Sequence, residues 1–213
     1  MRYRDIRPAI DEVDDTGKIN FSNSDSFEEV IKKVRNDEEN RIGYGKYREG
    51  WHHPFDKRLV IKWAKPRDNN TLEDCALRNF WEFIVWHAAK DKGGEELEIL
   101  MPCHEIHPDG HWLTMRKGTR VEQDKEVPKQ KTAWIGDRKK DNFAMLDGDY
   151  KDIDYGSEKA LKHFNLPNDY DSCKKIVMQI LKKTNAPINN PNYGKSQKQN
   201  DPLTPDAVKV DEA

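Results

Sequence analysis

Two carboxylates and an amide within residues 134–156 could bind a divalent cation. Asp137 and Asn142 stand five residues apart in a predicted turn, and Asp154 ends the strand that follows. Carboxylate and amide oxygens are hard ligands that suit Mg²⁺, and a carboxylate can also accept a hydroxyl proton. The sequence therefore indicates either a metal- and phosphate-handling site or a solvated acidic hairpin.

The other aspartates of this stretch are expected to serve the hairpin itself. Asp147 precedes Gly148, and an Asp-Gly pair is favoured in the type I′ turns that join antiparallel strands. We interpret Asp141, Asp149 and Asp152 as solvated side chains on its surface.

A lysine within a predicted strand is the next chemically informative residue. Lys62 lies in the apolar run 59–64, and strand alternation places it on the same face as Val60. Such a lysine either reaches solvent or meets an anion. Glu82 stands in the middle of an apolar helical pattern, where an unpaired carboxylate would be costly. We therefore predict an ion pair between Lys62 and Glu82.

Three glycines precede this lysine. Gly43, Gly45 and Gly50 lie between two candidate strands, and a glycine backbone can approach a phosphate because no Cβ intervenes. Ordinary turn glycines are the alternative. No helix is predicted directly after them, so the Rossmann dinucleotide fingerprint is excluded.

A metal site built from cysteine and histidine is disfavoured. Cys103, His104, His107 and His111 flank a predicted Pro-Asp-Gly turn, and alternation sends His104 and His107 to opposite faces. The three cysteines are widely spaced and odd in number, so no disulfide framework is predicted.

The scaffold that must position these residues mixes helices with antiparallel strands. Capping and apolar spacing predict three helices, one beginning at Ser26, one over 71–90 and one over about 170–183. Extended segments and turn residues predict three strands within 41–64, two within 97–107 and 111–117, and a hairpin over 142–153. Residues 117–130 are predicted to be a connection, and the fold class is α+β.

Composition and charge narrow the classes of partner. The 213 residues include 37 basic and 39 acidic side chains, a balance that argues against nucleic-acid binding. The start of the chain lacks the apolar run of a signal peptide, and no window is long enough to span a membrane. We expect a soluble, cytoplasmic protein that binds neither nucleic acid nor membrane.

The order of these features resembles the protein kinase-like superfamily. The matching features, in chain order, are a glycine-rich hairpin, Leu59-Val60-Ile61-Lys62, Glu82, an Asp-x-Lys-x-x-Asn motif at Asp137, Lys139 and Asn142, and Asp154-Tyr155-Gly156. The last motif is similar to Asp-Phe-Gly with tyrosine in place of phenylalanine. The chain most resembles small bacterial and phage kinase-like proteins of the PhoP-regulatory-network type, through an Arg-x-x-Tyr/Trp-x-His-Pro element at residues 48–54. If a phage encodes the chain, the expected compartment is the host cytoplasm.

The resemblance implies a nucleotide site that uses ATP and Mg²⁺. Lys62, oriented by Glu82, would hold the α- and β-phosphates, while Gly43 and Gly45 cover them. Met115 would lie where the hinge between the lobes meets adenine.

It also implies roles for the second group of residues. Asp137 would position or deprotonate the acceptor hydroxyl, and Lys139 would steady the transferring phosphate. Asn142 and Asp154 would hold Mg²⁺.

The chain departs from the family in its second half. Too few residues remain for the usual helical lobe, and no Ala-Pro-Glu segment is present. The expected organisation is an N-terminal extension at 1–23, a kinase-like N-lobe with a five-stranded antiparallel sheet and a preceding helix at 24–116, a minimal C-lobe at 117–184 and a disordered tail at 185–213.

Two functions are compatible with these features. The first is a Mg-ATP-dependent phosphotransferase acting on a hydroxyl of a protein or small molecule. The alternative is a catalytically weak kinase-like module that regulates a host or partner protein by binding it.

Overall fold

The described part of the chain combines two antiparallel sheets with a group of helices. The computed structural model describes residues 35, 38–54, 56–122, 134 and 139–184. The strands are β1 (Arg41–Tyr44), β2 (Arg48–His52), β3 (Leu59–Ala64), β4 (Cys103–Ile106), β5 (Trp112–Arg116), β6 (Thr119–Arg120), β7 (Phe143–Leu146) and β8 (Asp149–Asp152). The helices are α3 (Leu72–Lys92), α4 (Glu95–Glu98), α5 (Glu158–His163) and α6 (Tyr170–Lys183), with 3-10 turns η2 (Glu38–Asn40) and η4 (Lys140–Asn142).

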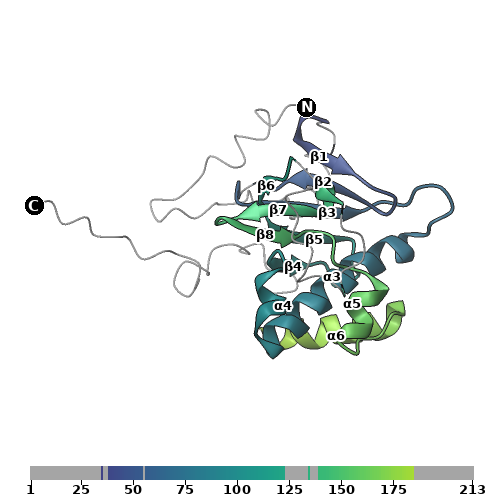
Figure 1. The fold of residues 1–213 in the computed structure, drawn as a ribbon. Coiled ribbons are helices and arrows are strands. Elements are labelled where there is room, and N and C mark those ends of the chain that lie inside the picture. Colours follow the sequence, from purple (N-terminus) through teal and green to yellow (C-terminus); the bar gives the residue numbers. More distant parts are fainter. Residues whose placement is uncertain (1–34, 36–37, 55, 123–133, 135–138, 185–213) are drawn as a thin grey trace, which may run out of the picture.

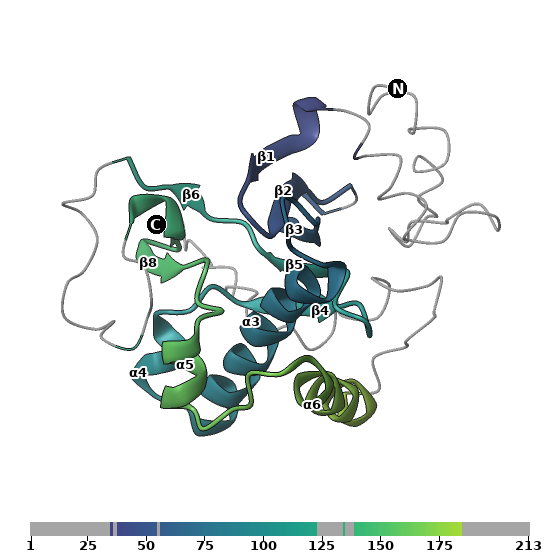
Figure 2. The same ribbon diagram turned by 90° about the vertical axis from the view of Figure 1, so that its right-hand side faces the viewer.

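The helices gather on one side of the strands (Figure 1). In the view turned by 90°, α6 lies beside α3, against which it packs (Figure 2). The α+β class with a five-stranded antiparallel sheet is therefore confirmed.

The larger sheet has the strand order β1-β2-β3-β5-β4, and all its neighbours are antiparallel. Lys62 is in register with Gly50 on one side and Leu113 on the other. Its two neighbours in the strand, Ile61 and Trp63, point to the opposite face, where Ile61 packs in a cluster with Trp51 and Trp112. Lys62 thus points toward α3, as the predicted alternation requires.

Helix α3 is the element around which the rest packs. Thr71 caps its N-terminus in the predicted capping box with Asp74, and Gly93, at φ 70°, ends it. Residues on several sides of the helix are buried, including Phe80, Phe83 and Ile84. Such a helix must be enclosed by other elements, and the sheet, α5 and α6 all contact it.

The smaller sheet is built on the predicted Asp-Gly hairpin. Asp147 and Gly148 both have positive φ, at 53° and 87°, as a type I′ turn demands. The predicted connection is wrong over residues 119–120, because β6 pairs with β7 to give a sheet of three strands. The N–H of Asp152 donates to the carbonyl of Ile99 at 2.7 Å, which ties this sheet to the chain before β4.

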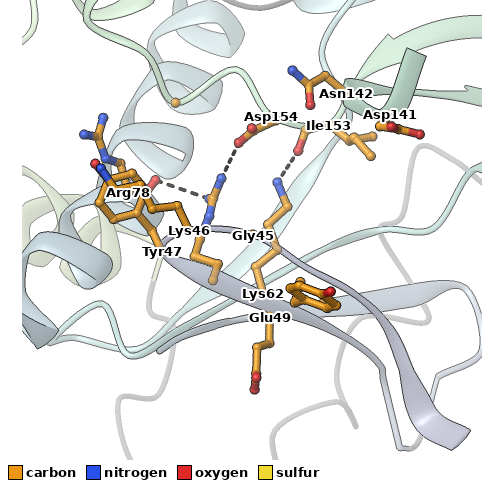
Figure 3. A pocket seen from close by; sticks show the side chains of 14 residues that line it. Gly45, Lys46, Tyr47, Glu49, Lys62, Arg78, Asp141, Asn142, Ile153 and Asp154 are labelled. Carbon is orange, nitrogen blue, oxygen red and sulfur yellow. Dashed lines mark hydrogen bonds and ion pairs between the residues drawn. The ribbon is translucent and has the colours of Figure 1, made fainter. Parts of the chain in front are cut away.

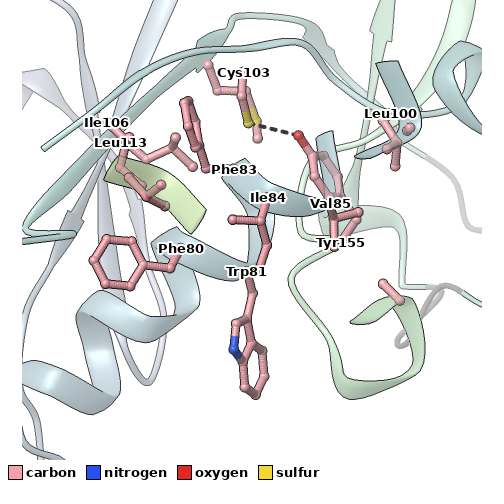
Figure 4. Packing of buried hydrophobic residues seen from close by; sticks show 14 of the residues in the cluster. Phe80, Trp81, Phe83, Ile84, Val85, Leu100, Cys103, Ile106, Leu113 and Tyr155 are labelled. Carbon is pink, nitrogen blue, oxygen red and sulfur yellow. Dashed lines mark hydrogen bonds between the residues drawn. The ribbon is translucent and has the colours of Figure 1, made fainter. Parts of the chain in front are cut away.

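The main core joins both halves of the described chain. Figure 4 shows Phe80, Phe83 and Ile84 of α3 meeting Leu113 from the sheet and Tyr155 from the segment after β8. The Tyr155 hydroxyl donates to the carbonyl of Met101 at 2.8 Å and lies 2.9 Å from Cys103 Sγ. Tyr155, the middle residue of the Asp154-Tyr155-Gly156 motif, is therefore a fully buried core residue.

Some predicted elements match closely and others lie outside the described residues. Helix α6 has the bounds predicted for it, whereas α4 and α5 were not predicted. The extension 1–23, the helix beginning at Ser26 and the tail 185–213 fall outside the described ranges. No helix among the described residues has the length and apolar character needed to cross a bilayer.

Candidate functional site

A cavity of about 470 Å³ opens between the β1–β2 hairpin and the segment that follows β8. Figure 3 shows its two walls, with the hairpin on one side and Asn142 and Asp154 on the other. The lining residues are Tyr44, Gly45, Lys46, Tyr47, Arg48, Glu49, Gly50, Lys62, Arg78, Asp141, Asn142, Ile153, Asp154 and Gly156.

The predicted ion pair between Lys62 and Glu82 is present in this cavity's wall. Lys62 Nζ lies 2.9 Å from Glu82 Oε1 and 2.8 Å from Oε2, and it also donates to the carbonyl of Ile153. The Glu82 side chain is 0% exposed, and that of Lys62 is 14% exposed. A fully buried carboxylate is stable there because charged donors satisfy both of its oxygens.

Arg48 is the second cation that holds Glu82, and the sequence analysis assigned it no role. Its Nη2 lies 2.8 Å from Glu82 Oε1 and also donates to Asp154 Oδ1. Although burial opposes its charge, Glu82 and Asp154 raise the pKa of Arg48. Arg48 is two residues from Gly50, the register partner of Lys62, so strand alternation could have indicated that both cations share one face.

Asp154 lies where these cations converge. Burial raises the pKa of its carboxyl group, but Arg48 and Lys62 outweigh that effect and lower it below the usual value. Asp154 is therefore a stable carboxylate in the cavity wall.

Asp152, which was interpreted as solvated, is fully buried, so that interpretation is wrong. Its Oδ1 accepts the backbone N–H of Asp154 at 2.8 Å, and its Oδ2 has no hydrogen-bond partner among the described residues. Burial raises the pKa of Asp152 well above its usual value, and the nearby Asp154 and Glu82 add to the shift. Strand alternation alone could not predict that Asp152 is buried. Which face of β8 is buried depends on the segment before β4, which packs against it.

The η4 turn brings Asn142 to the same cavity. The carbonyl of Asn142 accepts the N–H of Ile153 at 2.8 Å, so the start of β7 lies beside the residue before Asp154. Asn142 and Asp154 thus both line the cavity, while the predicted convergence of these two residues with Asp137 on one metal ion stays a prediction. Lys139 is exposed at the start of η4 and does not line the cavity, and Asp137 lies outside the described residues.

The residues expected to cover the phosphates or to meet adenine differ in whether they line the cavity. Gly45 lines it, whereas Gly43 is exposed on β1 opposite Gly50. Met115 is fully buried in the core and in register with Val60, away from the cavity lining.

Gly156, which closes the Asp-Tyr-Gly motif, packs directly on α3. A Cβ at this position would lie 2.9 Å from Glu82 Cγ and 3.0 Å from the carbonyl of Arg78. The absence of a side chain therefore lets the segment carrying Asp154 approach the helix carrying Glu82.

The described residues contain no group of three or more histidine, cysteine or acidic side chains that could hold a metal ion. His107 stacks on His111 at 4.6 Å between ring centroids, and Cys103 lies beside Tyr155 in the core. The two histidines thus contact each other, whereas Cys103 contacts Tyr155.

Comparison with known proteins identifies no relative. No protein-family model, no curated protein and no solved structure matches the chain. The chemistry of the cavity must therefore be inferred from its own side chains.

Proposed function

We propose that the protein has a reduced kinase-like fold and is a Mg-ATP-dependent phosphotransferase. The observation that carries this proposal is the buried Lys62–Glu82 pair, whose lysine lines a cavity that also presents Asp154 and Asn142. A lysine held by a helix glutamate, with an acidic and an amide oxygen opposite, is the arrangement that protein kinases use for phosphoryl transfer.

The side chains present fit a magnesium nucleotide in their chemistry. Lys62 and Arg48 offer positive charge to phosphate oxygens, and the Asp154 carboxylate with the Asn142 amide offers oxygen ligands to Mg²⁺. Mg²⁺, when bound, neutralises charge on the phosphates.

In the proposed reaction the acceptor oxygen bonds to the γ-phosphorus as the bond to the β–γ bridging oxygen breaks. Lys62, kept in position by Glu82, binds phosphate oxygens and stabilises their charge. The hydroxyl proton passes to a carboxylate, expected to be Asp137, and ADP leaves. The acceptor is a hydroxyl of a protein or a small molecule.

Nucleotide binding tests this proposal directly. ATP with Mg²⁺ should raise the unfolding midpoint of the wild-type protein, because a ligand of the native state stabilises it. Lys62→Met should weaken ATP binding about 10- to 100-fold, since a charge-assisted hydrogen bond contributes about 1.5–3 kcal/mol. Lys57→Met, at an exposed lysine of the β2–β3 turn, is the matched control and should leave binding unchanged.

Transfer is then measured with γ-labelled ATP, first on the protein alone and then with a cell lysate. Label should appear on an acceptor with wild-type protein and disappear with Asp154→Asn. An undiminished ATP-induced shift in Lys62→Met, or transfer that survives in Asp154→Asn, would contradict the proposal.

The contact between Arg48 and Asp154 favours a second candidate function. A guanidinium already occupies one oxygen of the proposed Mg²⁺ ligand, an arrangement suited to a catalytically weak kinase-like module that regulates a partner by binding. This candidate predicts partner capture that survives Lys62→Met and Asp154→Asn. Label transfer by wild-type protein at a rate abolished by either variant would exclude it.

A further inference from the structure

The cations that line the cavity fall into two groups, which differ in whether a carboxylate is paired with them. Arg48 and Lys62 are paired with Glu82 and Asp154. Lys46 and Arg78 also line the cavity, yet neither forms an ion pair with a carboxylate of the described residues.

The remaining acidic residues of the lining do not compensate this charge. Glu49 points away from the cavity in Figure 3 and is bound on the other face of the sheet by Arg35, Lys65 and Arg67. Asp141 lies 3.3 Å from the guanidinium of Arg120. Outside the lining, Asp74 interacts electrostatically with Arg78 and is hydrogen-bonded to Thr71. Two cations against this one carboxylate leave the end of the cavity formed by Lys46 and Arg78 with excess positive charge.

Two aromatic rings contact the Arg78 guanidinium. Its guanidinium lies 4.1 Å from the ring centroid of Trp81 and 4.6 Å from that of Tyr47, and its Nε is buried with no hydrogen-bond acceptor among the described residues. Aromatic rings orient an arginine and leave available the in-plane N–H groups that do not meet the Tyr47 hydroxyl, so a stacked guanidinium is suited to binding phosphate or carboxylate.

Lys46 reaches the same aromatic ring from the hairpin. Its Nζ lies 5.0 Å from the Tyr47 ring centroid, so Tyr47 stands between the two unpaired cations. Lys46, and to a lesser extent Arg78, lower the pKa of the Tyr47 hydroxyl below its usual value. The local potential at this end of the cavity is thus positive.

This end is separate from the residues proposed to hold the nucleotide phosphates and Mg²⁺. In Figure 3, Arg78 and Tyr47 lie on one side of Asp154, and Asn142 lies on the other side. An anion at Arg78 and a nucleotide at Lys62 and Asn142 could therefore be bound together.

We infer that Arg78 and Lys46 form an anion subsite that binds a phosphate or carboxylate group of the acceptor. This assignment of substrate class rests on the proposed phosphotransferase function. The acceptor is then a small anionic molecule or an anionic side chain that carries its hydroxyl near Asp154.

Inorganic phosphate is the probe for this subsite, with the unfolding midpoint as the readout at constant ionic strength. Phosphate should raise the midpoint of the wild-type protein relative to chloride, both alone and in the presence of saturating ATP and Mg²⁺. Arg78→Gln and Lys46→Gln should each weaken phosphate binding about tenfold or more, because each removes a charge-assisted contact.

Arg58→Gln is the matched control, since Arg58 is exposed and paired with Asp56 outside the cavity, and it should retain the full phosphate shift. If Arg78→Gln does not fold because the contacts with Trp81 and Tyr47 are lost, the exposed Lys46→Gln still decides the question.

The outcomes separate this inference from the function on which it rests. If the unfolding midpoint rises with ATP but not with phosphate, the anion subsite is overturned. The phosphotransferase proposal is unaffected by that result. A phosphate shift that saturating ATP abolishes assigns both cations to the nucleotide and overturns the acceptor assignment. If ATP gives no shift, the proposed function is overturned, whereas an Arg78-dependent phosphate shift still establishes the anion subsite.

Discussion

Among the described aspartates of residues 134–156, Asp152 is the one that is fully buried. It is 0% exposed, directly behind Asp154, and one of its oxygens has no partner among the described residues. In the folded protein its pKa is raised above the usual 3.8, first by burial and then by Asp154 and Glu82. The folded state therefore holds the Asp152 proton more tightly than the unfolded state does.

This raised pKa predicts a pH-dependent effect of Asp152→Asn. The wild-type protein loses stability as the pH rises from 3.8 toward the raised pKa, because the buried group must then remain protonated or bear an unfavourable charge. Asparagine does not titrate, so the variant does not lose this stability. The difference between the free energies of unfolding, variant minus wild type, should therefore increase from pH 4.5 to pH 8. The increase should be about 1.4 kcal/mol for each unit by which the pKa is raised within that range.

Urea unfolding at both pH values measures this difference. Asp149→Asn, at an exposed position of the same strand, is the control, and the change for Asp152→Asn is measured relative to it. A pH-independent difference for Asp152→Asn would mean that Asp152 is ionised at its ordinary pKa in the folded protein.

Helix α3 is the element on which the site and the core both depend. It places Arg78 in the cavity wall, holds Lys62 through Glu82, and carries Phe80 and Ile84 into the core. Gly110 of the β4–β5 turn packs so closely on it that a Cβ would lie 2.8 Å from the carbonyl of Ala76. The start of this helix therefore influences the stability of the whole described structure.

Thr71→Ala should destabilise the protein by about 1 kcal/mol, because it removes the side chain that accepts the N–H of Asp74 at 3.1 Å. For a chain of this size the unfolding midpoint should fall by about 2–4 °C. Thermal unfolding followed by circular dichroism measures the change, and Asn69→Ala in the exposed turn before the helix is the control. An unchanged midpoint would show that the capping box contributes nothing in solution.

The sequence was sufficient to predict α3 and the hairpins, but not every short element. Capping residues and turn glycines act locally, so the start of α3 and the Asp147-Gly148 turn could be predicted from neighbouring residues alone. Strand β6 has two residues and no pattern of its own, and it exists because β7 offers it a partner.

At the scale of the whole molecule, residues predicted to form separate lobes share one core. Phe80 and Leu113, from the predicted 24–116 lobe, belong to the same cluster as Tyr155, Leu161 and Val177 from the predicted 117–184 lobe. Backbone hydrogen bonds of Asp152 with Ile99 and Met101 reinforce this connection. The division into lobes remains a prediction, but the shared core makes their stabilities interdependent.

The described structure should therefore unfold in a single cooperative transition. Tryptophan fluorescence, far-ultraviolet circular dichroism and calorimetry should give coincident midpoints, and the calorimetric and van't Hoff enthalpies should agree. Leu161→Ala, in α5, should shift all three signals together by a similar amount. Two separated transitions, with only one affected by Leu161→Ala, would show that the halves fold independently.

By itself, the sequence determined the α+β class, the positions of the main helices and hairpins, and the pairing of Lys62 with Glu82. These follow from local periodicity, capping and the high cost of an unpaired buried carboxylate. Only the tertiary structure decided which aspartates are buried, that Arg48 bridges Glu82 and Asp154, and that within the described ranges Arg78 meets the rings of Tyr47 and Trp81 rather than a carboxylate. The physical reason is that burial and charge pairing at these residues depend on contacts between segments far apart in the chain, which no local pattern encodes.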